Sequence, residues 1–316
     1  MADLDERNKS TAEKSLPQTL LRRLEELLLR EAPEAGTLYI VGTPIGNLGD
    51  LSPRALGTLA RVDYIAAEDT RRTAELLAYF SLKKPLISYH EHNEQARSPE
   101  LLELLRQGKS LALVSDAGMP VLSDPGSVLT DLCLEEGLPV KVIPGPAAAV
   151  SALALSGLPA EDFRFIGFLP VKGRARKEKT AALKAYEGTS ILYEAPHRLE
   201  KTLKDLDKAG LGERRLALAR ELTKQYEEVK RGSVEALAAY YAEHPARGEY
   251  VLVLGPPSPA EKEAAREAAQ DALEEKIRQS LSAGATARDI IEEIGEKSGF
   301  SKNELKRLIG QIRRTL

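Results

Sequence analysis

The sequence has little cysteine, no long apolar run and no large excess of charge of either sign. Its single cysteine, Cys133, stands in the apolar stretch VLTDLCLEEG. This usage excludes an intramolecular disulfide, CxxC redox chemistry and a cysteine-rich zinc site, and it favours a reducing, cytoplasmic location. The 45 lysines and arginines are balanced by 48 acids, so the formal charge is only −3. The chain as a whole is therefore not a basic wrapper of nucleic acid, and any site for a polyanion must be local.

No apolar run approaches the ~18 residues that a membrane helix needs. The first residues, MADLDERNKSTAEK, are charged where a signal peptide would be apolar. We expect a soluble, untargeted protein with no membrane partner. The 316 residues are enough for two domains at the usual ~150 residues each.

The spacing of apolar runs predicts an α/β first domain over residues 37–145. Residues 1–36 precede it as an extension whose amphipathic helix docks on the body or forms an arm. Short apolar runs alternate with segments long enough for crossover helices, which predicts a mostly parallel sheet with strands at 38–41, 62–67, 85–90, 111–116 and 140–145. Serine followed by proline marks expected helix starts at 52–53 and 98–99.

The remaining chain predicts a linker, a second α/β domain and a helical tail. Residues 146–158 form the linker, with an apolar helix between Pro146 and Gly157. The second domain, 159–256, has expected strands at 163–169, 189–195, 215–221 and 249–255, with helices at 175–186, 196–209 and 233–243. Residues 257–316 are typical of helix, with two segments around Gly299 and Ser301 as a cap. This tail resembles a helix-turn-helix, and a plain helical hairpin fits it about as well.

Three loops rich in glycine and proline follow strands of the first domain. The first has the spacing GxxxGxxG at Gly42, Gly46 and Gly49, which is neither the dinucleotide fingerprint GxGxxG nor a Walker A loop. The second, SDAGMPVLSDPG at 115–126, is stiff and could offer fixed amides and carbonyls to a ligand. The third is the corner PGP at 144–146. We expect these loops to converge on one cleft at the carboxyl ends of the strands.

Charged residues follow two other strands. The segment AAEDTRRT at 66–73 places acids and arginines where ligands of open α/β sheets bind, and Asp69 could equally cap the next helix. His90 and His92 lack a third partner at ligand spacing, so we expect no metal site there.

Six motifs, in this order, resemble those of the tetrapyrrole methylase superfamily: VGTPIGNLGDLSPRAL, AEDTRRT, SDAGMPVLSDPG, VIPGPAAAVSAL, FIGFLP and YEAPHR. The resemblance covers about residues 37–255 and is closest to the bacterial 16S ribosomal RNA (cytidine-2′-O)-methyltransferase branch. It implies a two-domain class III methyltransferase fold, a homodimer and S-adenosylmethionine in the cleft between the domains. It also implies 2′-O-ribose methylation of a decoding-centre cytidine, cytidine 1402, in the small ribosomal subunit.

The resemblance also implies which residues bind the cofactor. They come from the first two loops, the interdomain corner and a second-domain strand: Gly42, Thr43, Pro44, Asp116, Ala117, Gly118, Met119, Ser123, Gly145, Pro146, Ala147, Tyr193 and Glu194.

A ribose hydroxyl is a weak nucleophile, so a positioned base should help it to lose its proton. The motif YEAPHR supplies Glu194 and His197 as candidate catalytic residues, with Asp69 and Asp124 as competitors. Alternatively, Pro196 begins a helix, Glu194 caps it, and His197 is an ordinary first-turn residue.

Candidate RNA contacts gather in the segment FLPVKGRARKEKT, 168–180, which we interpret as a flexible basic loop. The predicted contacts are Lys172, Arg174, Arg176, Lys177 and, beyond the loop, Arg198. The tail could add a second contact through Lys302, Lys306, Arg307, Arg313 and Arg314. Such charge runs are also typical of a solvated helix face.

Two rival hypotheses remain at this point. One keeps the fold and cofactor but methylates a tetrapyrrole or another small molecule. The other is a non-catalytic RNA-binding assembly factor with a vestigial pocket. In no case do we expect a DNA partner.

Overall fold

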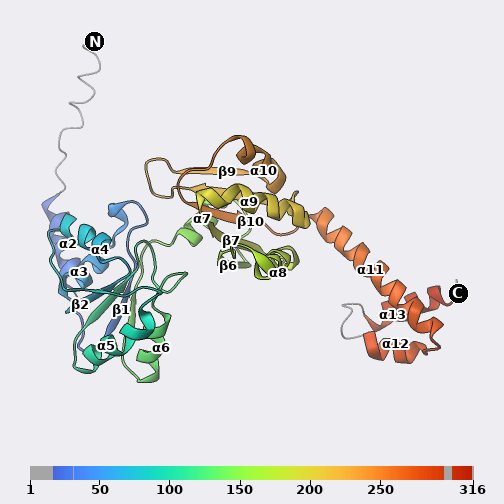
Figure 1. Cartoon of the computed structure of the whole chain (residues 1–316), viewed down its shortest axis with the longest axis horizontal. Helices are drawn as coiled ribbons and strands as arrows, with labels where there is room; N and C mark the ends of the chain where they lie inside the picture. The colour runs from blue at the N-terminus through green and yellow to red at the C-terminus, as the bar shows by residue number, and fades with distance from the viewer. Residues whose placement is uncertain (1–16, 31, 295–300, 315–316) are drawn as a thin grey trace, which may run out of the picture.

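A computed structural model describes residues 17–30, 32–294 and 301–314. It contains two α/β domains and a helical module that follow one another along the chain (Figure 1). The start of the expected N-terminal extension, 1–16, and the expected turn at Gly299 lie outside the described residues.

The first domain is built on a parallel sheet with strand order β3-β2-β4-β1-β5. Its strands are β1 Leu38–Val41, β2 Tyr64–Ala67, β3 Leu86–Ser88, β4 Leu111–Val114 and β5 Val140–Ile143. All five coincide with predicted apolar runs. The chain leaves β1 towards β2 and leaves β4 towards β5, so the connections depart in opposite directions from neighbouring strands. Such a switch point opens a crevice at the carboxyl ends of the strands.

Helices cover both faces of this sheet: α3 Pro53–Arg61, α4 Thr70–Tyr79, α5 Glu94–Arg106 and α6 Ser127–Glu135. Ser52 caps α3 as predicted, since its side chain accepts from the amide of Ala55. The helix start expected at Ser98 is wrong, because α5 already begins at Glu94 and contains Pro99. The buried Ser98 hydroxyl instead bonds the Tyr89 hydroxyl at 2.8 Å and the carbonyl of Glu94, which fixes the first turns of α5.

The second domain follows α7 Ala148–Ser156, the predicted linker helix. Its mixed sheet has the order β6-β7-β10-β8-β9, with β6 Phe163–Phe168, β7 Thr189–Glu194, β8 Arg215–Arg220, β9 Glu228–Ser233 and β10 Tyr250–Leu254. Helices α8 Gly173–Ala185, α9 Pro196–Leu206 and α10 Val234–Glu243 pack on one face, and α7 packs on the other. The expected helix at 196–209 is α9 followed by a π-helical turn, η2 Asp207–Leu211.

The helical module has α11 Pro259–Ser282, α12 Ala287–Ile294 and α13 Lys302–Ile312. Ser258 and Ser301 each form a capping box, which confirms the expected cap at Ser301. The module buries its own apolar cluster at the far end of α11 from the second domain (Figure 1). Among the described residues, no helix is long and apolar enough to cross a membrane.

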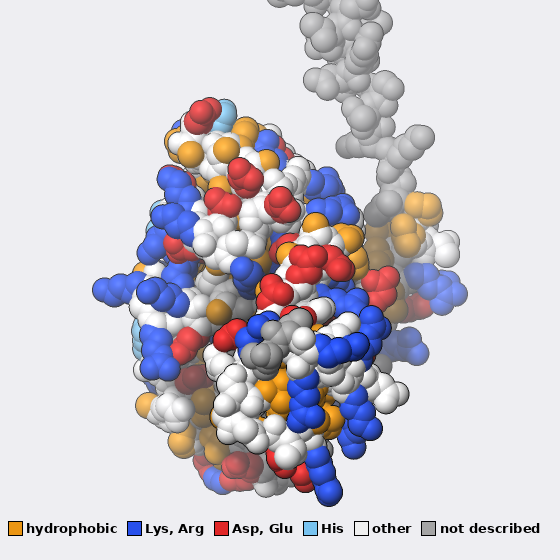
Figure 2. All heavy atoms as spheres, turned by 90° about the vertical axis from the view of Figure 1, so that its right-hand side faces the viewer, with side chains coloured by type: hydrophobic (Ala, Val, Ile, Leu, Met, Phe, Trp, Pro, Cys, Tyr) orange, Lys and Arg blue, Asp and Glu red, His pale blue; other side chains and the backbone are white. Residues whose placement is uncertain are grey.

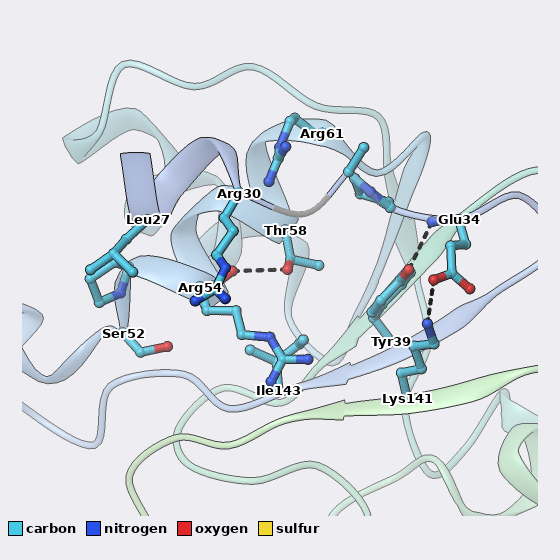
Figure 3. Close-up of a pocket in the computed structure, with 13 residues that line it drawn as sticks. Leu27, Arg30, Glu34, Tyr39, Ser52, Arg54, Thr58, Arg61, Lys141 and Ile143 are labelled. Atoms are coloured by element: carbon cyan, nitrogen blue, oxygen red, sulfur yellow. Dashed lines mark hydrogen bonds and ion pairs between the residues drawn. The ribbon is translucent and has the colours of Figure 1, made fainter. Parts of the chain in front are cut away.

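The amphipathic helix of the extension, α2 Gln18–Leu29, docks on α3. Arg61 of α3 donates to the carbonyl oxygens of Leu28 and Leu29 and so closes the C-terminal end of α2. A cavity of about 620 Å³ lies beside this contact (Figure 3). In it, Lys141 pairs with Glu34, and the Tyr39 hydroxyl accepts from the amide of Glu34. Of the two arrangements expected for this helix, docking on the body and an arm, the structure shows docking.

Candidate functional site

The loops after β1 and β4 are joined to each other at the switch point. The amide of Thr43 donates to the carbonyl of Gly118 at 2.9 Å, and the amide of Gly118 donates back at 3.1 Å. The Thr43 hydroxyl also donates to the carbonyl of Ser115 at 3.1 Å. This pairing confirms that the first two glycine-rich loops converge.

The third loop meets them through two glycines. A Cβ on Gly42 would lie 2.6 Å from the Cα of Gly145 and 2.7 Å from the Sδ of Met119. Any side chain at Gly42 would therefore push the corner at Gly145 away from the β1 loop. In the second loop Val121 and Ser123 have φ values of 74° and 71°. Non-glycine residues rarely adopt this conformation, and such strain is typical of ligand-binding loops.

A cavity of about 690 Å³ opens between these loops and the second domain. It is lined by the second loop, by the start of α7, and by the ends of β6, β7, β8 and β10. Eight of the predicted site residues line it: Ala117, Gly118, Met119, Ser123, Ala147, Tyr193, Glu194 and His197. The others contribute to the loops without being part of the lining: Gly42, Thr43, Pro44, Asp116, Gly145 and Pro146.

Several aromatic side chains line the cavity that were not predicted from the sequence. Phe163, Phe165 and Phe168 of β6 line it together with Tyr193 of β7. The ring of Tyr193 lies edge-on to Phe165 and Phe168, with centroid distances of 5.0 and 5.7 Å. Phe168 is 50% exposed, which is unusual for a phenylalanine inside a domain cleft. The motif FRFIGF suggested only a buried strand, because the cavity-facing side of a strand looks like a core-facing side.

Acidic side chains gather at the first-domain side of the cavity. Burial, together with the negative charges of Glu68 and Asp116, raises the pKa of Asp124 to about 6. Asp116 accepts from the amide of Asp69 at 3.0 Å and pairs with Arg72 at 3.3 Å. Asp124 thus changes charge near neutral pH, and a cationic ligand would favour its ionised form.

Asp69, unlike Asp124, is held by a neighbouring arginine. It caps α4 by accepting from the amide of Arg71, and the Arg71 guanidinium holds the pKa of its carboxyl well below the usual range. The capping role weighed for Asp69 is confirmed, and its basicity is low.

The two candidate catalytic residues differ in their surroundings. Glu194 is 3% exposed, and its carboxylate accepts from the Thr202 hydroxyl, pairs with Arg198 at 3.1 Å and accepts from the amide of Ala195. His197 is exposed in the first turn of α9 and lines the cavity. His197 is therefore accessible to a substrate, whereas Glu194 mainly holds the start of α9.

The basic segment is a helix rather than the expected flexible loop, since α8 begins at Gly173. Arg176 points into the domain, where it pairs with Asp205 at 2.7 Å and donates to the Thr202 hydroxyl at 2.9 Å. Lys172, Lys177 and Lys179 are exposed, and Arg174 pairs with Glu178 along the helix. Arg198 is occupied by Glu194 and the carbonyl of Leu169. Only part of the predicted RNA-binding set is thus free to meet a phosphate.

In the part of the chain that the structure describes, no three histidine, cysteine or acidic side chains lie together as a metal site would require. The rings of His90 and His92 lie 6.0 Å apart, and Nε2 of His90 is 3.2 Å from Nδ2 of Asn93.

The comparison with known families decides the assignment. The model of the family described as Tetrapyrrole (Corrin/Porphyrin) Methylases matches residues 37–238. The chain belongs to this family.

Two similar relatives are both named "Ribosomal RNA small subunit methyltransferase I". The protein of Synechocystis sp. is 49% identical over 227 residues, which cover 72% of this chain and 81% of that protein. The protein of Bacillus subtilis is 39% identical over 287 residues, 90% of this chain and 97% of its own length. A solved cobalt precorrin-4 methyltransferase shares the fold at 18% identity, with a TM-score of 0.53 over 70% of this chain and 95% of that one.

Proposed function

We propose that this methyltransferase modifies ribosomal RNA of the small subunit, transferring a methyl group from S-adenosylmethionine to a ribose 2′-hydroxyl. The proposed acceptor is the decoding-centre cytidine, cytidine 1402 of 16S ribosomal RNA. The observation that carries the proposal is the similarity to relatives named for this substrate. With the Bacillus subtilis protein it extends over 90% of the chain, which is more than the family model covers. A likeness confined to the methylase domains would leave a small-molecule substrate equally well supported.

The residues of the cavity fit S-adenosylmethionine. The space of about 690 Å³ lies within the range of small-molecule and cofactor pockets. Gly118 brings backbone without a side chain to the lining, and the carboxylate of Asp124 complements a cationic ligand. When bound, the cofactor supplies a methyl group on a positively charged sulfur. The cavity residues then align donor and acceptor and exclude water.

We propose that His197 accepts the proton of the ribose hydroxyl on a ring nitrogen. Its exposed position in the cavity wall allows it to reach a bound nucleotide. Glu194 positions it, because its bonds to Thr202 and Arg198 fix the first turns of α9. Lys172, Arg174 and Lys177 near the start of α8 would contact RNA phosphates beside the cleft.

A homodimer is part of this proposal. Val142 on the edge strand β5 and Val150 on α7 are 52% and 51% exposed, and both offer apolar surface to a second copy.

The deciding experiment incubates the protein with labelled S-adenosylmethionine and small subunits that lack the modification. We expect label at one alkali-resistant ribose linkage. His197→Gln should bind the cofactor normally and lose most of the transfer. Label on a tetrapyrrole but not on subunits would overturn the RNA substrate. Absence of any cofactor binding would favour a non-catalytic assembly factor.

A further inference from the structure

Of the helices α11, α12 and α13, only α13 carries a net positive charge. Helices α11 and α12 are net acidic, with six acids against four bases in α11 and three against one in α12. From Ser301 to Arg314 there are five cations and one acid, Glu304. The carboxylate of Glu304 accepts from the amide of Ser301 in the capping box. Figure 2 views the molecule from the side of this module and shows lysine and arginine side chains gathered over it.

The cations of α13 form one face. Leu305, Ile309 and Ile312 are buried against the other helices of the module. At 100° per residue Arg307 and Arg314 project opposite this core, and Lys302, Lys306 and Arg313 lie on the flank between the two. Arg313 and Arg314 follow directly after the end of α13, and all five cations are exposed. Within the described residues none of the five has an ion-pair partner, although Arg314 donates to the carbonyl of Gly310 at 3.1 Å. Their charge is therefore available to a polyanion.

Gly310 stands at the centre of this face. A Cβ at Gly310 would meet nothing within 4 Å, and its φ is not in the left-handed region. The fold therefore does not require glycine there, and an interior helical glycine weakens a helix relative to alanine. A bare backbone between two rows of cations allows a close approach by the sugar-phosphate chain of a ligand.

We infer that the α13 face, Lys302, Lys306, Arg307, Gly310, Arg313 and Arg314, binds an RNA backbone at a distance from the nucleotide that is methylated. This inference rests on the proposed function for the identity of the RNA. With 24 residues, α11 is roughly 36 Å long, and it holds the face away from the cleft (Figure 1). The module therefore anchors the enzyme on a second segment of the small-subunit RNA while the cleft takes the target.

The test compares two double variants of exposed, adjacent cations. Lys306→Gln with Arg307→Gln removes charge from the α13 face, and Arg22→Gln with Arg23→Gln removes the same charge from α2. The full-length proteins are titrated with an unmodified transcript of the small-subunit RNA at several salt concentrations. We expect the α13 variant to bind roughly tenfold more weakly near physiological salt. The slope of log affinity against log salt should fall by about 1.4–1.8, with the α2 variant unchanged.

A third variant, Gly310→Gln, shows whether weaker binding by the double variant could come from misfolding. It should strengthen the helix and still weaken RNA binding, because the added side chain fills the central position. Unchanged binding by both α13 variants, equal losses in the α2 control, or tighter binding of duplex DNA than of RNA would overturn the inference.

The same proteins separate this inference from the proposed function. Methyl transfer at saturating subunits should survive in the α13 variants, since the face lies away from the cleft. If the wild type binds RNA through α13 but transfers no methyl group, the proposed function fails alone. If it transfers methyl groups and the α13 variants bind normally, the inference fails alone. A wild type that binds no transcript and transfers no methyl group to subunits overturns both.

Discussion

Asp124 shows how a single residue can favour ligand binding at the expense of the fold. Its carboxyl lies in the cleft beside other acids, and burial raises its pKa to about 6, above the ordinary 3.8 of an aspartate. A raised pKa means that the folded state binds the proton more tightly than the unfolded chain does. The ionised carboxylate is thus destabilising at neutral pH, and this penalty fades as the pH falls from about 6 towards 4.

We predict that Asp124→Asn stabilises the protein and weakens cofactor binding. At pH 7.5 the free energy of unfolding should rise by about 1–2 kcal/mol, after allowance for partial solvent screening. This advantage should shrink as the pH is lowered through 6. Urea titrations of both proteins at several pH values measure it. Cofactor affinity of the wild type should fall below pH 6, whereas that of the variant should be low and nearly independent of pH. A variant that binds the cofactor as well as the wild type would remove Asp124 from the site.

At the scale of elements, a chain of hydrogen bonds ties α8 and α9 to the end of β7. Asp205 holds Arg176, Arg176 donates to the Thr202 hydroxyl, and Thr202 donates to the buried carboxylate of Glu194. The hydroxyl of Thr202 is thus the link between the two charged pairs. It keeps the turn that presents His197 attached to the sheet.

We predict that Thr202→Val lowers the free energy of unfolding by about 2–3 kcal/mol, because one oxygen of the buried Glu194 carboxylate loses its donor. Thr202→Ser keeps the hydroxyl and should cost less than about 1 kcal/mol. Urea denaturation of the two variants and the wild type provides the measurement. A larger loss in Thr202→Ser than in Thr202→Val would mean that methyl packing, and not the hydrogen bond, is what matters at this position.

The elements that the sequence predicts well are those with strong local signals. Apolar runs located the five strands of the first domain, and Ser52-Pro53 located the start of α3. The edge strand β9 was missed because its segment EVKRGS is polar and partly exposed, which removes the hydrophobic signal. The buried position of Arg176 could not be predicted either, since its partner Asp205 lies on another helix 29 residues away.

Part of the candidate site could likewise be predicted from the sequence, and part could not. The glycine-rich loops were visible because their composition is unusual, and the structure joins them at Thr43 and Gly118. The aromatic wall at Phe163, Phe165 and Phe168 was not visible, because alternation along a strand does not distinguish a core from a cleft. Tertiary contact alone determines which face of β6 meets the first domain.

At the scale of the whole molecule, the helical module is joined to the α/β body mainly through one ion pair. Arg214, whose side chain is 2% exposed, pairs with Glu261 at 3.0 Å in the first turn of α11. It also donates to the carbonyls of Leu183 and Lys184, which anchors it in the second domain. The apolar cluster of the module starts only at Leu273 and includes no residue of the body.

We therefore predict that two truncations differ in their effect on the stability of the α/β body. A chain ending at Gln270 keeps the Arg214–Glu261 pair and loses the module core. It should bind S-adenosylmethionine normally and unfold at nearly the wild-type urea concentration. A chain ending at Pro257 leaves Arg214 buried without its carboxylate, and the body should lose about 2–3 kcal/mol, since the two carbonyl acceptors remain. Cofactor titration and urea denaturation of both truncations test this. Loss of cofactor binding in the longer truncation would show that the module supports the cleft, and the anchoring role inferred for α13 would then no longer be separable from catalysis.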